Sequence, residues 1–266
     1  MMQKRLFAGL LLLAFVGCLY GQTKNQRDAT GRKQGYWEAV DSNGRLVYSG
    51  YFENDKPVGE IKRYYPTGEV RVIMNYDRQS AKVRARFFQK SGELVAQGNY
   101  IGTLRDSVWL FYSEIAKTVS RRATYTAGKL NGKEQSFYPD GTVAEETMWK
   151  DGLRNGPWTQ YFDNGQPKAV STYLNDKLNG AYTVFYPDGK PMAEGVYRQD
   201  IPDGDWKRYD ENGKPASTIR YANGKITNAD ELEAAEQELF KKLMEQAGSL
   251  KEPTLEDALR ETQQNR

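Results

Sequence analysis

Histidine is absent from this sequence, and cysteine occurs once, at position 18. A Ser-His-Asp triad, a Cys-His pair and the usual zinc sites all need residues that the chain lacks. One cysteine cannot form an intrachain disulfide, so stability must come from packing and hydrogen bonding. These absences exclude the commonest routes to nucleophilic catalysis.

Phosphate and calcium motifs are missing as well. The chain has no GxxxxGK[ST] loop, which would cradle a nucleotide phosphate. Asp200, Asp203 and Asp205 come nearest to a calcium loop but miss its alternating spacing and closing glutamate. Glu145 and Glu146 are adjacent, and adjacent strand residues face opposite sides, so they do not share a glycosidase-type site. We therefore assign no catalytic residue, no metal and no cofactor, and we predict that the chain is not an enzyme.

Long hydrophobic runs are scarce, and the one that exists lies at the N-terminus. Leu6 to Gly17 is apolar and follows Lys4 and Arg5; the run is too short for a membrane-spanning helix and is typical of a secretory signal. Two cleavage modes stay open, lipidation at Cys18 or cleavage after Gly21. Either predicts an exported protein of the periplasm or outer membrane, with or without a lipid anchor.

Repetition is what the sequence has in abundance. The phrases NGKEQSFYPDG, NGPWTQYFDNG, NGAYTVFYPDG and DGDWKRYDENG follow one another with a fixed period of 24 residues. We number each repeat from its leading glycine as position zero: Gly132, Gly156, Gly180 and Gly204. A fixed period of this size indicates a repeat protein.

The same register extends toward the N-terminus. It places Gly35, Gly59, Val83 and Ser107 at position zero of four earlier repeats, with one extra residue near Lys117. Position seventeen is then aromatic in all eight repeats: Phe52, Tyr76, Tyr100, Tyr125, Trp149, Tyr173, Tyr197 and Tyr221.

Two turn signals in each repeat predict a β-hairpin. One lies at positions seven to nine, as in Pro187-Asp188-Gly189, and the other precedes the next leading glycine; Asp-Gly and Asn-Gly tolerate the positive φ of tight turns. The segments between them are rich in aromatic and β-branched residues, as strands are. We predict an all-β array, an elongated antiparallel meander of about eight hairpins, rather than the alternative of a parallel β-helix.

The predicted core is a ladder of aromatic rings. Position seventeen carries a ring in every repeat and position two carries one in several, such as Trp158 and Tyr182, whereas positions thirteen and fifteen are often small, for example at Ala193 and Gly195. Small residues leave room for a ring of the neighbouring repeat to lie across the sheet.

The phrases G-x-W-x-x-Y-Y-x-x-G and Y-x-N/D-G-K resemble the variant MORN repeats (membrane occupation and recognition nexus), in particular exported proteins of Bacteroidetes-type bacteria that automated naming often labels an antitoxin family. The similarity covers Gly31 to about Ile226. It implies a repeat architecture and no catalytic residue. Val83, Ser107 and the loop SEIAKTVS depart from the pattern.

Beyond the array the period changes to that of a helix. Asn228 with Glu231 forms a predicted N-terminal cap, and Leu232, Ala235, Leu239, Phe240, Leu243 and Ala247 form one apolar stripe. We divide the chain into a signal segment (1–21, or ending before Cys18), a flexible tether (22–33), the repeat array (34–226) and a C-terminal helical cap and tail (227–266). The helix is expected to cover the last hairpin, with partner binding as the alternative.

Charge is uneven along the chain. Residues 61–122 hold twelve basic and five acidic side chains, whereas residues 229–261 hold four basic and ten acidic. Lys82, Arg84 and Arg86 alternate on one predicted strand, so they share a face. Together with aromatic and basic residues of the next repeat they form the predicted partner-binding set: Lys82, Arg84, Arg86, Trp109, Tyr112, Arg121 and Arg122.

These observations predict a non-catalytic, exported binding or scaffold protein of the cell envelope with a protein partner. A membrane-surface module that binds anionic lipid is one alternative, an antitoxin-like inhibitor of a partner protein is another, and a carbohydrate-active enzyme is the least favoured. Export argues against nucleic acid as a partner. The sequence leaves the partner and the oligomeric state open.

Overall fold

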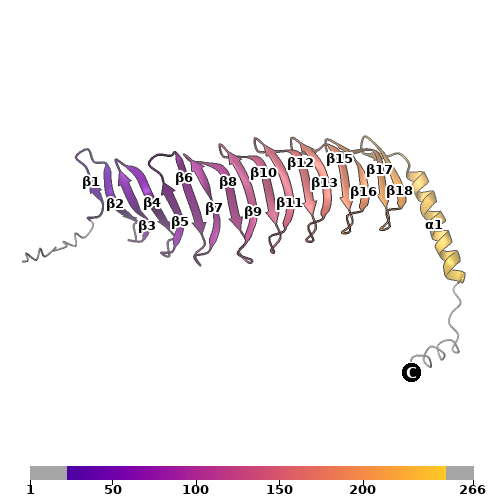
Figure 1. Ribbon diagram of the computed structural model, residues 1–266, viewed down its shortest axis with the longest axis horizontal. Coiled ribbons are helices and arrows are strands. Elements are labelled where there is room, and N and C mark those ends of the chain that lie inside the picture. Colours follow the sequence, from indigo (N-terminus) through magenta and orange to yellow (C-terminus); the bar gives the residue numbers. More distant parts are fainter. Residues whose placement is uncertain (1–22, 250–266) are drawn as a thin grey trace, which may run out of the picture. The chain divides into compact units, whose positions relative to one another are not determined.

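The computed structural model describes residues 23–249. Cys18 and the predicted signal segment lie outside these residues, as does the tail after Ser249. The chain divides after Leu94 into two compact units, and all strand pairs described in each unit are antiparallel. The fold is therefore the predicted antiparallel meander of repeated hairpins, and the parallel β-helix is excluded (Figure 1).

The first unit contains six strands. They are β1 (Gln26–Arg27), β2 (Lys33–Val40), β3 (Leu46–Glu53), β4 (Lys56–Tyr64), β5 (Val70–Tyr76) and β6 (Lys82–Phe88).

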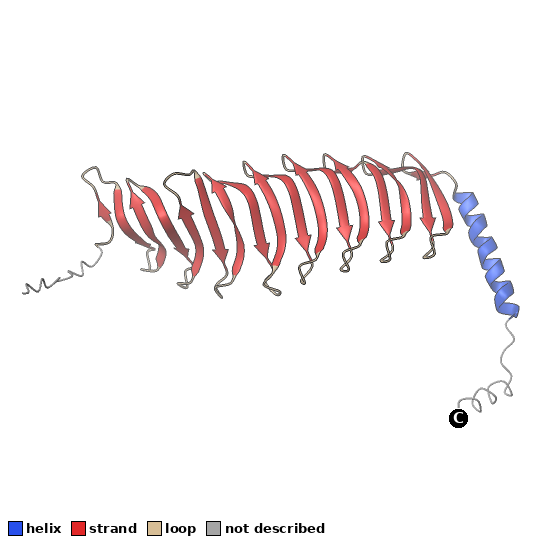
Figure 2. Cartoon of the chain, in the orientation of Figure 1, coloured by secondary structure: helices blue, strands red, loops and turns tan. Residues whose placement is uncertain are grey.

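The second unit contains the remaining strands and the helix. They are β7 (Leu94–Ile101), β8 (Leu104–Tyr112), β9 (Val119–Thr126), β10 (Lys129–Phe137), β11 (Val143–Lys150), β12 (Leu153–Tyr161), β13 (Pro167–Leu174), β14 (Lys177–Leu178), β15 (Gly180–Phe185), β16 (Pro191–Arg198), β17 (Ile201–Tyr209), β18 (Pro215–Ala222), β19 (Lys225–Ile226) and α1 (Ala229–Ser249). Figure 2 shows these elements by type.

The turn at positions seven to nine forms as predicted. Its last residue is a glycine with positive φ, for example 92° at Gly141 and 86° at Gly189. In the repeat that starts at Ser107 the inserted residue lengthens this turn, and Lys117 takes the left-handed conformation with φ 59°. The insertion is thus absorbed in one turn, and the strand register continues after it.

A tyrosine at position six joins successive hairpins. The hydroxyl of Tyr138 donates to the carbonyl of Tyr161 (2.7 Å), and that of Tyr186 donates to the carbonyl of Tyr209 (2.9 Å). In the first unit the hydroxyl of Tyr65 makes the same bond to the carbonyl of Phe88 (2.8 Å). Because each bond spans one repeat, it sets the distance between neighbouring hairpin tips.

The aromatic ladder is present on one face of the second unit. The rings of Trp158, Tyr182 and Trp206 follow one another at centroid distances of 6.3 and 5.9 Å. Position-seventeen rings pack edge-on against them, as Tyr197 does against Trp206 at 5.0 Å. A Cβ built on Gly195 would lie 2.2 Å from the Trp206 ring, which explains why this position is a glycine beside the ring.

The leading glycine has a conformational role of its own. It lies in a strand and not in a turn, and it has positive φ, as at Gly59 (65°), Gly180 (125°) and Gly204 (70°). The strand pairing shifts register there: Gly50 pairs with Ile61, but the next residue of β3 pairs with Val58. The leading glycine therefore forms a β-bulge, which lets the tight turn between repeats close.

Residues 23–33 are not a flexible tether, so that prediction is wrong for the described part. β1 pairs with β2, and the Thr30 hydroxyl (2.7 Å) and Arg32 main-chain N–H (3.0 Å) donate to Asp28. These hydrogen bonds hold the pKa of the Asp28 carboxyl well below its usual range. Asn25 covers the edge of β2, since its N–H donates to the Tyr36 carbonyl (2.8 Å) and its Oδ1 accepts from the Glu38 N–H (2.8 Å).

The C-terminal edge is covered in the same way, and not by the helix. The Asn228 side chain accepts from the Arg220 N–H (2.9 Å) and donates to the Thr218 carbonyl (2.9 Å). It thereby imitates a neighbouring strand residue and does not cap the helix. The predicted capping box is wrong, because Glu231 instead pairs with Arg220 at 3.0 Å.

Candidate functional site

Val83 breaks the repeat within the first unit. It replaces the leading glycine, and it is not among the residues with positive φ, whereas Ser107 at the same position keeps φ 60°. A β-branched side chain strongly disfavours the left-handed region. Pairing of β5 with β6 accordingly runs without a shift, from Met74–Ala85 through Asn75–Arg84 to Tyr76–Val83. The bulge is lost at this one strand pair.

Losing the bulge changes the turn that joins the two strands. A regular turn such as Asn175-Asp176 packs on the preceding turn, where Asp176 N–H donates to Arg154 O (2.9 Å) and Asp176 Oδ1 accepts from Arg154 N–H (2.8 Å). Between β5 and β6, five residues (77–81) form the connection. There the N–H of Gln79 donates to the side chain of Asp77 at 2.8 Å. The loop therefore satisfies this N–H internally, and the Arg78 side chain, which reaches Glu53, links the loop to the preceding repeat.

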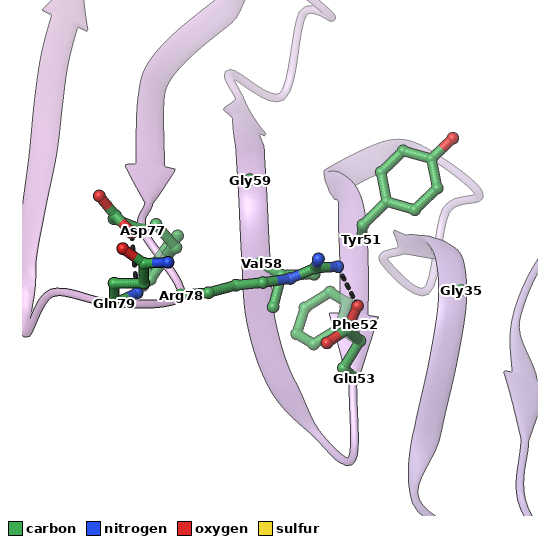
Figure 3. A pocket seen from close by; sticks show the side chains of 10 residues that line it. Gly35, Tyr51, Phe52, Glu53, Val58, Gly59, Asp77, Arg78 and Gln79 are labelled. Carbon is green, nitrogen blue, oxygen red and sulfur yellow. Dashed lines mark hydrogen bonds and ion pairs between the residues drawn. The ribbon is translucent and has the colours of Figure 1, made fainter.

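A hollow of about 630 Å³ lies beside this loop. Figure 3 shows it, with the Arg78 side chain reaching across β4 toward Glu53. Its side-chain lining includes aromatic, apolar and charged groups: Tyr51, Phe52, Glu53, Val58, Arg78 and Gln79.

An exposed ion pair crosses the hollow. Arg78 and Glu53 form a salt bridge between two exposed side chains, and such pairs contribute roughly 0 to 1 kcal/mol. Tyr51 is 41% exposed, and its ring packs against Tyr36 at 5.3 Å. Little free energy therefore opposes the release of Arg78 toward a ligand.

Lys82, Arg84 and Arg86 lie on the same face of the sheet as Tyr51. The row Gly50–Ile61–Met74–Ala85 runs across β3 to β6 through paired residues, and Ala85 is fully buried. Tyr51 follows Gly50 in β3, and Arg84 precedes Ala85 in β6. Because neighbouring residues of a strand point to opposite faces, both side chains project from the face opposite to the row. About 14 Å, or three strand spacings, separates them.

The strand face around Arg84 is basic. Residues 56–88 contain eight lysines and arginines and three acidic residues. Lys62 and Arg86 both pair with Ile73, one from each side, so their side chains join the same face. We call Lys62, Lys82, Arg84 and Arg86 the basic face.

The predicted binding residues of the second unit do not form one surface. Trp109 is fully buried, and its indole N–H donates to the Asn99 carbonyl at 3.0 Å. Because no part of the ring reaches the surface, its assignment as a partner-binding residue is wrong. Position two belongs to the ladder, as Trp158 and Trp206 also show.

Three other predicted residues divide between the two faces. Arg121 lies on the ladder face, with its guanidinium 4.2 Å from the Phe111 ring centre and 3.0 Å from Glu134. Arg122 projects from the other face beside Gln135 (3.5 Å), where the Tyr112 hydroxyl accepts from Gln97 (2.6 Å). Successive strand residues point to opposite sides, so Arg121 cannot join Arg122 and Tyr112 in one patch.

Two of the carboxylates weighed from the sequence, Asp200 and Asp203, make structural contacts. Asp200 accepts the N–H of Leu178 at 2.6 Å, the turn contact made by Asp176 in the preceding repeat. Asp203 pairs with Arg198 at 2.6 Å. Within residues 23–249, no group of three or more His, Cys, Asp or Glu side chains is arranged to hold a metal ion. No helix in the described part of the chain has the length and apolarity to cross a membrane.

Comparison with known families identifies the repeat. The model of the MORN repeat variant matches five segments of the chain, residues 57–78, 130–151, 154–175, 178–199 and 202–223. The chain is a MORN-repeat protein. The match omits the repeats that start at Gly35, Val83 and Ser107, two of which lack the leading glycine. MORN repeats generally act as protein- or membrane-binding modules.

Other comparisons add little. No curated protein matches the chain. A mutant of S. aureus TarM in complex with fondaparinux, α-GlcNAc-glycerol and UDP is 15% identical over 46% of this chain and 21% of its own, with a TM-score of 0.22. TcdB2-TccC3-TEV is 10% identical over 76% of this chain and 12% of its own, with a TM-score of 0.19. This chain thus spans about a fifth or less of those structures, and TM-scores this low carry no argument about its fold or function.

The hollow beside residues 77–81 was missed by reasoning from sequence. Val83 was recognised as a departure, and DRQSA lacks the Asx-Gly pair of the other turns. These two signals together point to an open loop. They could not show which side chains line the hollow, because Tyr51, Val58 and Arg78 come from three different segments.

Proposed function

We propose that this protein is a non-catalytic, exported binding protein of the cell envelope, and that its first unit binds an acidic segment of a protein partner. The observation that carries the proposal is the loss of the bulge at Val83, which leaves an open hollow beside the basic face. A regular repeat sheet offers the same surface many times, and this break creates a distinct one.

The chemistry of the surface indicates the kind of partner. The basic face contains four cations, of which Lys62 is paired with Glu60 at 3.2 Å, and the hollow contributes Tyr51 and Arg78. Tyrosine and arginine are enriched among the residues that dominate protein interfaces. An acidic side chain of a partner would compete with Glu53 for Arg78, while neighbouring carboxylates would meet Arg84 and Arg86.

A charge-reversal experiment tests the basic face. Arg84→Glu with Arg86→Glu should abolish recovery of the partner from the native envelope. The control, Lys168→Glu with Lys214→Glu, changes net charge equally at exposed positions of the second unit and should leave recovery unchanged. Binding by the wild-type protein should weaken as salt rises from about 0.05 to 0.5 M, because screening shortens the reach of exposed charges.

The outcomes are distinct. Equal loss in both double variants would refute a specific surface and indicate general charge attraction. Retained partner binding by Arg84→Glu with Arg86→Glu would refute the proposal. Binding of the wild-type protein to anionic lipid vesicles, lost in the same variant and with no protein partner recovered, would favour the membrane-surface alternative.

A neutral substitution tests the hollow separately. Val83→Gly restores the leading glycine without changing any charge, so it should restore the bulge, close residues 77–81 and weaken partner binding. Val83→Ile keeps the β-branch and should bind as the wild type does. Equal affinity of Val83→Gly and wild type would show that the hollow takes no part in recognition.

Export is a separate part of the proposal, supported by the charged and apolar N-terminal segment. The mature protein should fractionate with the cell envelope and begin at Cys18 or Gln22. Metabolic palmitate labelling of wild type and Cys18→Ala distinguishes the two cleavage modes. Recovery from the cytoplasm with an intact Met1 would refute export.

A further inference from the structure

The helix α1 carries an apolar patch that the sheet leaves exposed. It joins the sheet at its first turn, where Glu231 pairs with Arg220 and Asn228 binds β18. Farther along, Leu239, Phe240, Leu243 and Met244 are 58%, 64%, 54% and 58% exposed. Figure 2 shows the helix leading away from the sheet, and these four side chains are exposed, so the predicted cover over the last hairpin is wrong for this part of the helix.

These four residues form one patch by helical geometry. Leu243 and Met244 lie one turn after Leu239 and Phe240, so all four project from neighbouring positions on one side. Most helices in proteins gain their stability from packing an apolar face. An apolar face of this kind is stabilised when another surface covers it.

Charge on the helix selects among the surfaces that could cover the patch. Residues 229–245 contain six acidic and two basic side chains. Glu236 lies one turn before Phe240 and two turns before Leu243, so it belongs to the same face. Glu238, by contrast, is paired with Lys242 at 3.6 Å. A surface that covers the patch must also supply a cation to Glu236, because burying an unpaired carboxylate is costly.

A second copy of α1 does not meet this requirement. A parallel pair of identical helices would set Glu236 against its equivalent, and like charges repel. In an antiparallel pair centred on the patch, Glu236 would lie against a part of the second helix that has no lysine. We propose that Glu236, Leu239, Phe240, Leu243 and Met244 form a docking surface for a basic amphipathic helix of a partner protein, in which apolar side chains cover the patch and a lysine or arginine pairs with Glu236.

Binding of model helices to the full chain tests this surface. The probes are a fluorescent synthetic helix with a leucine stripe flanked by lysines, and its counterpart with glutamates in place of the lysines. We expect the lysine probe to bind the wild-type protein and the glutamate probe not to bind. Phe240→Ala with Leu243→Ala should weaken binding of the lysine probe roughly tenfold or more, and circular dichroism should show an intact helix because alanine favours helix formation.

A matched pair of charge variants separates docking from general attraction. Glu236→Lys and Glu245→Lys change net charge equally, but Glu245 does not lie on the face of the patch. Glu236→Lys should abolish binding, whereas Glu245→Lys should retain most of it. Equal effects of the two variants, or unchanged binding by Phe240→Ala with Leu243→Ala, would overturn the inference.

Two further outcomes are informative. A wild-type dimer in sedimentation that Phe240→Ala with Leu243→Ala dissociates would overturn the inference, since a second copy would then cover the patch. Arg84→Glu with Arg86→Glu should bind the lysine probe as wild type does. The inference therefore stands or falls independently of the function proposed for the first unit.

Discussion

The turn that follows β5 and the turn that follows β13 come from the same 24-residue phrase, yet only the second is tight. Asp176 there bonds to the turn before it, and Gly180 takes φ 125° in the bulge. Residues 77–81 form an open loop instead, and Val83 stands where Gly180 stands. A left-handed residue costs roughly 1 to 2 kcal/mol when it has a side chain. The residue at position zero thus distinguishes the closed turn after β13 from the open loop after β5.

Position two differs between the same two regions. Tyr182 contributes a ring to the ladder, whereas Ala85 in the irregular repeat is fully buried without a ring. The Tyr182 repeat therefore gains aromatic packing at position two that the Val83 repeat lacks. The comparison teaches that a distinct surface appears where the phrase is not repeated faithfully.

The largest effect is expected when a fully buried ring at position two is replaced by the residue found at Ala85. Trp109→Ala should lower the free energy of unfolding by about 3 to 5 kcal/mol, because it empties a fully buried ring site. Urea denaturation followed by tyrosine fluorescence measures it. Trp158→Ala serves as the comparison and should cost less, since that ring is only half-buried. Wild-type midpoints for both variants would show that the ladder is not the core.

Filling the space under a ladder ring should have the next largest effect. Gly195→Ala places a Cβ against the Trp206 ring and should destabilise by about 1 to 3 kcal/mol through overpacking. Thr172→Ala, at an exposed site on the other face, should change stability by no more than about 0.5 kcal/mol. Equal midpoints for the two variants would contradict the packing seen at position fifteen.

Exchanging the residues at position zero should exchange the behaviour of the two turns. Gly180→Val should lower the free energy of unfolding by about 1 to 2 kcal/mol, because valine is disfavoured in the left-handed conformation. If the turn opens to relieve this strain, the amide hydrogens of residues 175–178 should exchange faster. Val83→Gly should slow exchange in residues 77–81. Mass spectrometry of hydrogen exchange measures both. Unchanged exchange in both variants would show that the bulge does not control turn closure.

Acidification should produce the smallest effect, and it should act on the regular turns. The main-chain N–H of Arg154 lowers the pKa of Asp176, and the main-chain N–H of Thr142 lowers that of Asp140. A lowered pKa in the folded state contributes stability above the unfolded value of about 3.9, and this stability is lost as pH falls through the folded value. The melting temperature should therefore be nearly flat from pH 7 to 5 and fall below about pH 4.

An amide substitution tests the origin of that fall. Asp176→Asn keeps the acceptor oxygen but cannot titrate, so its melting temperature should decline less steeply below about pH 4 than that of the wild type. Identical pH profiles would place the acid sensitivity elsewhere.

Much of the fold could be predicted because its determinants are local. The 24-residue period, the glycine at position nine and the small residue at position fifteen each constrain their own hairpin. Alternation along a strand assigns faces without knowledge of the rest of the molecule. The same rule placed Lys82, Arg84 and Arg86 together correctly. It also separates Arg121 from Arg122, which the predicted patch had joined.

The predictions that failed depend on contacts between distant segments. The Asn228 side-chain amide binds main-chain groups of β18 instead of the N–H groups at the helix N-terminus. An asparagine side chain can satisfy either set, and the sequence does not show which set lies closer. The polar composition of residues 23–33 predicts a tether, but β1 within this segment pairs with β2 and is ordered by that pairing. Trp109 resembled an interface anchor because amphipathic rings serve both in cores and at surfaces.

By itself, the sequence determined the repeat length, the antiparallel hairpins, the ladder positions and the absence of histidine and disulfide chemistry. Each follows from residue type and spacing within about two dozen residues. Only the tertiary structure decided that the leading glycine forms a bulge, that Val83 opens a hollow beside the basic face, and that α1 leaves its apolar patch exposed. The physical reason is that these features depend on which main-chain and side-chain groups of separate segments meet, and one substitution such as Val83 can redirect those contacts without altering the period.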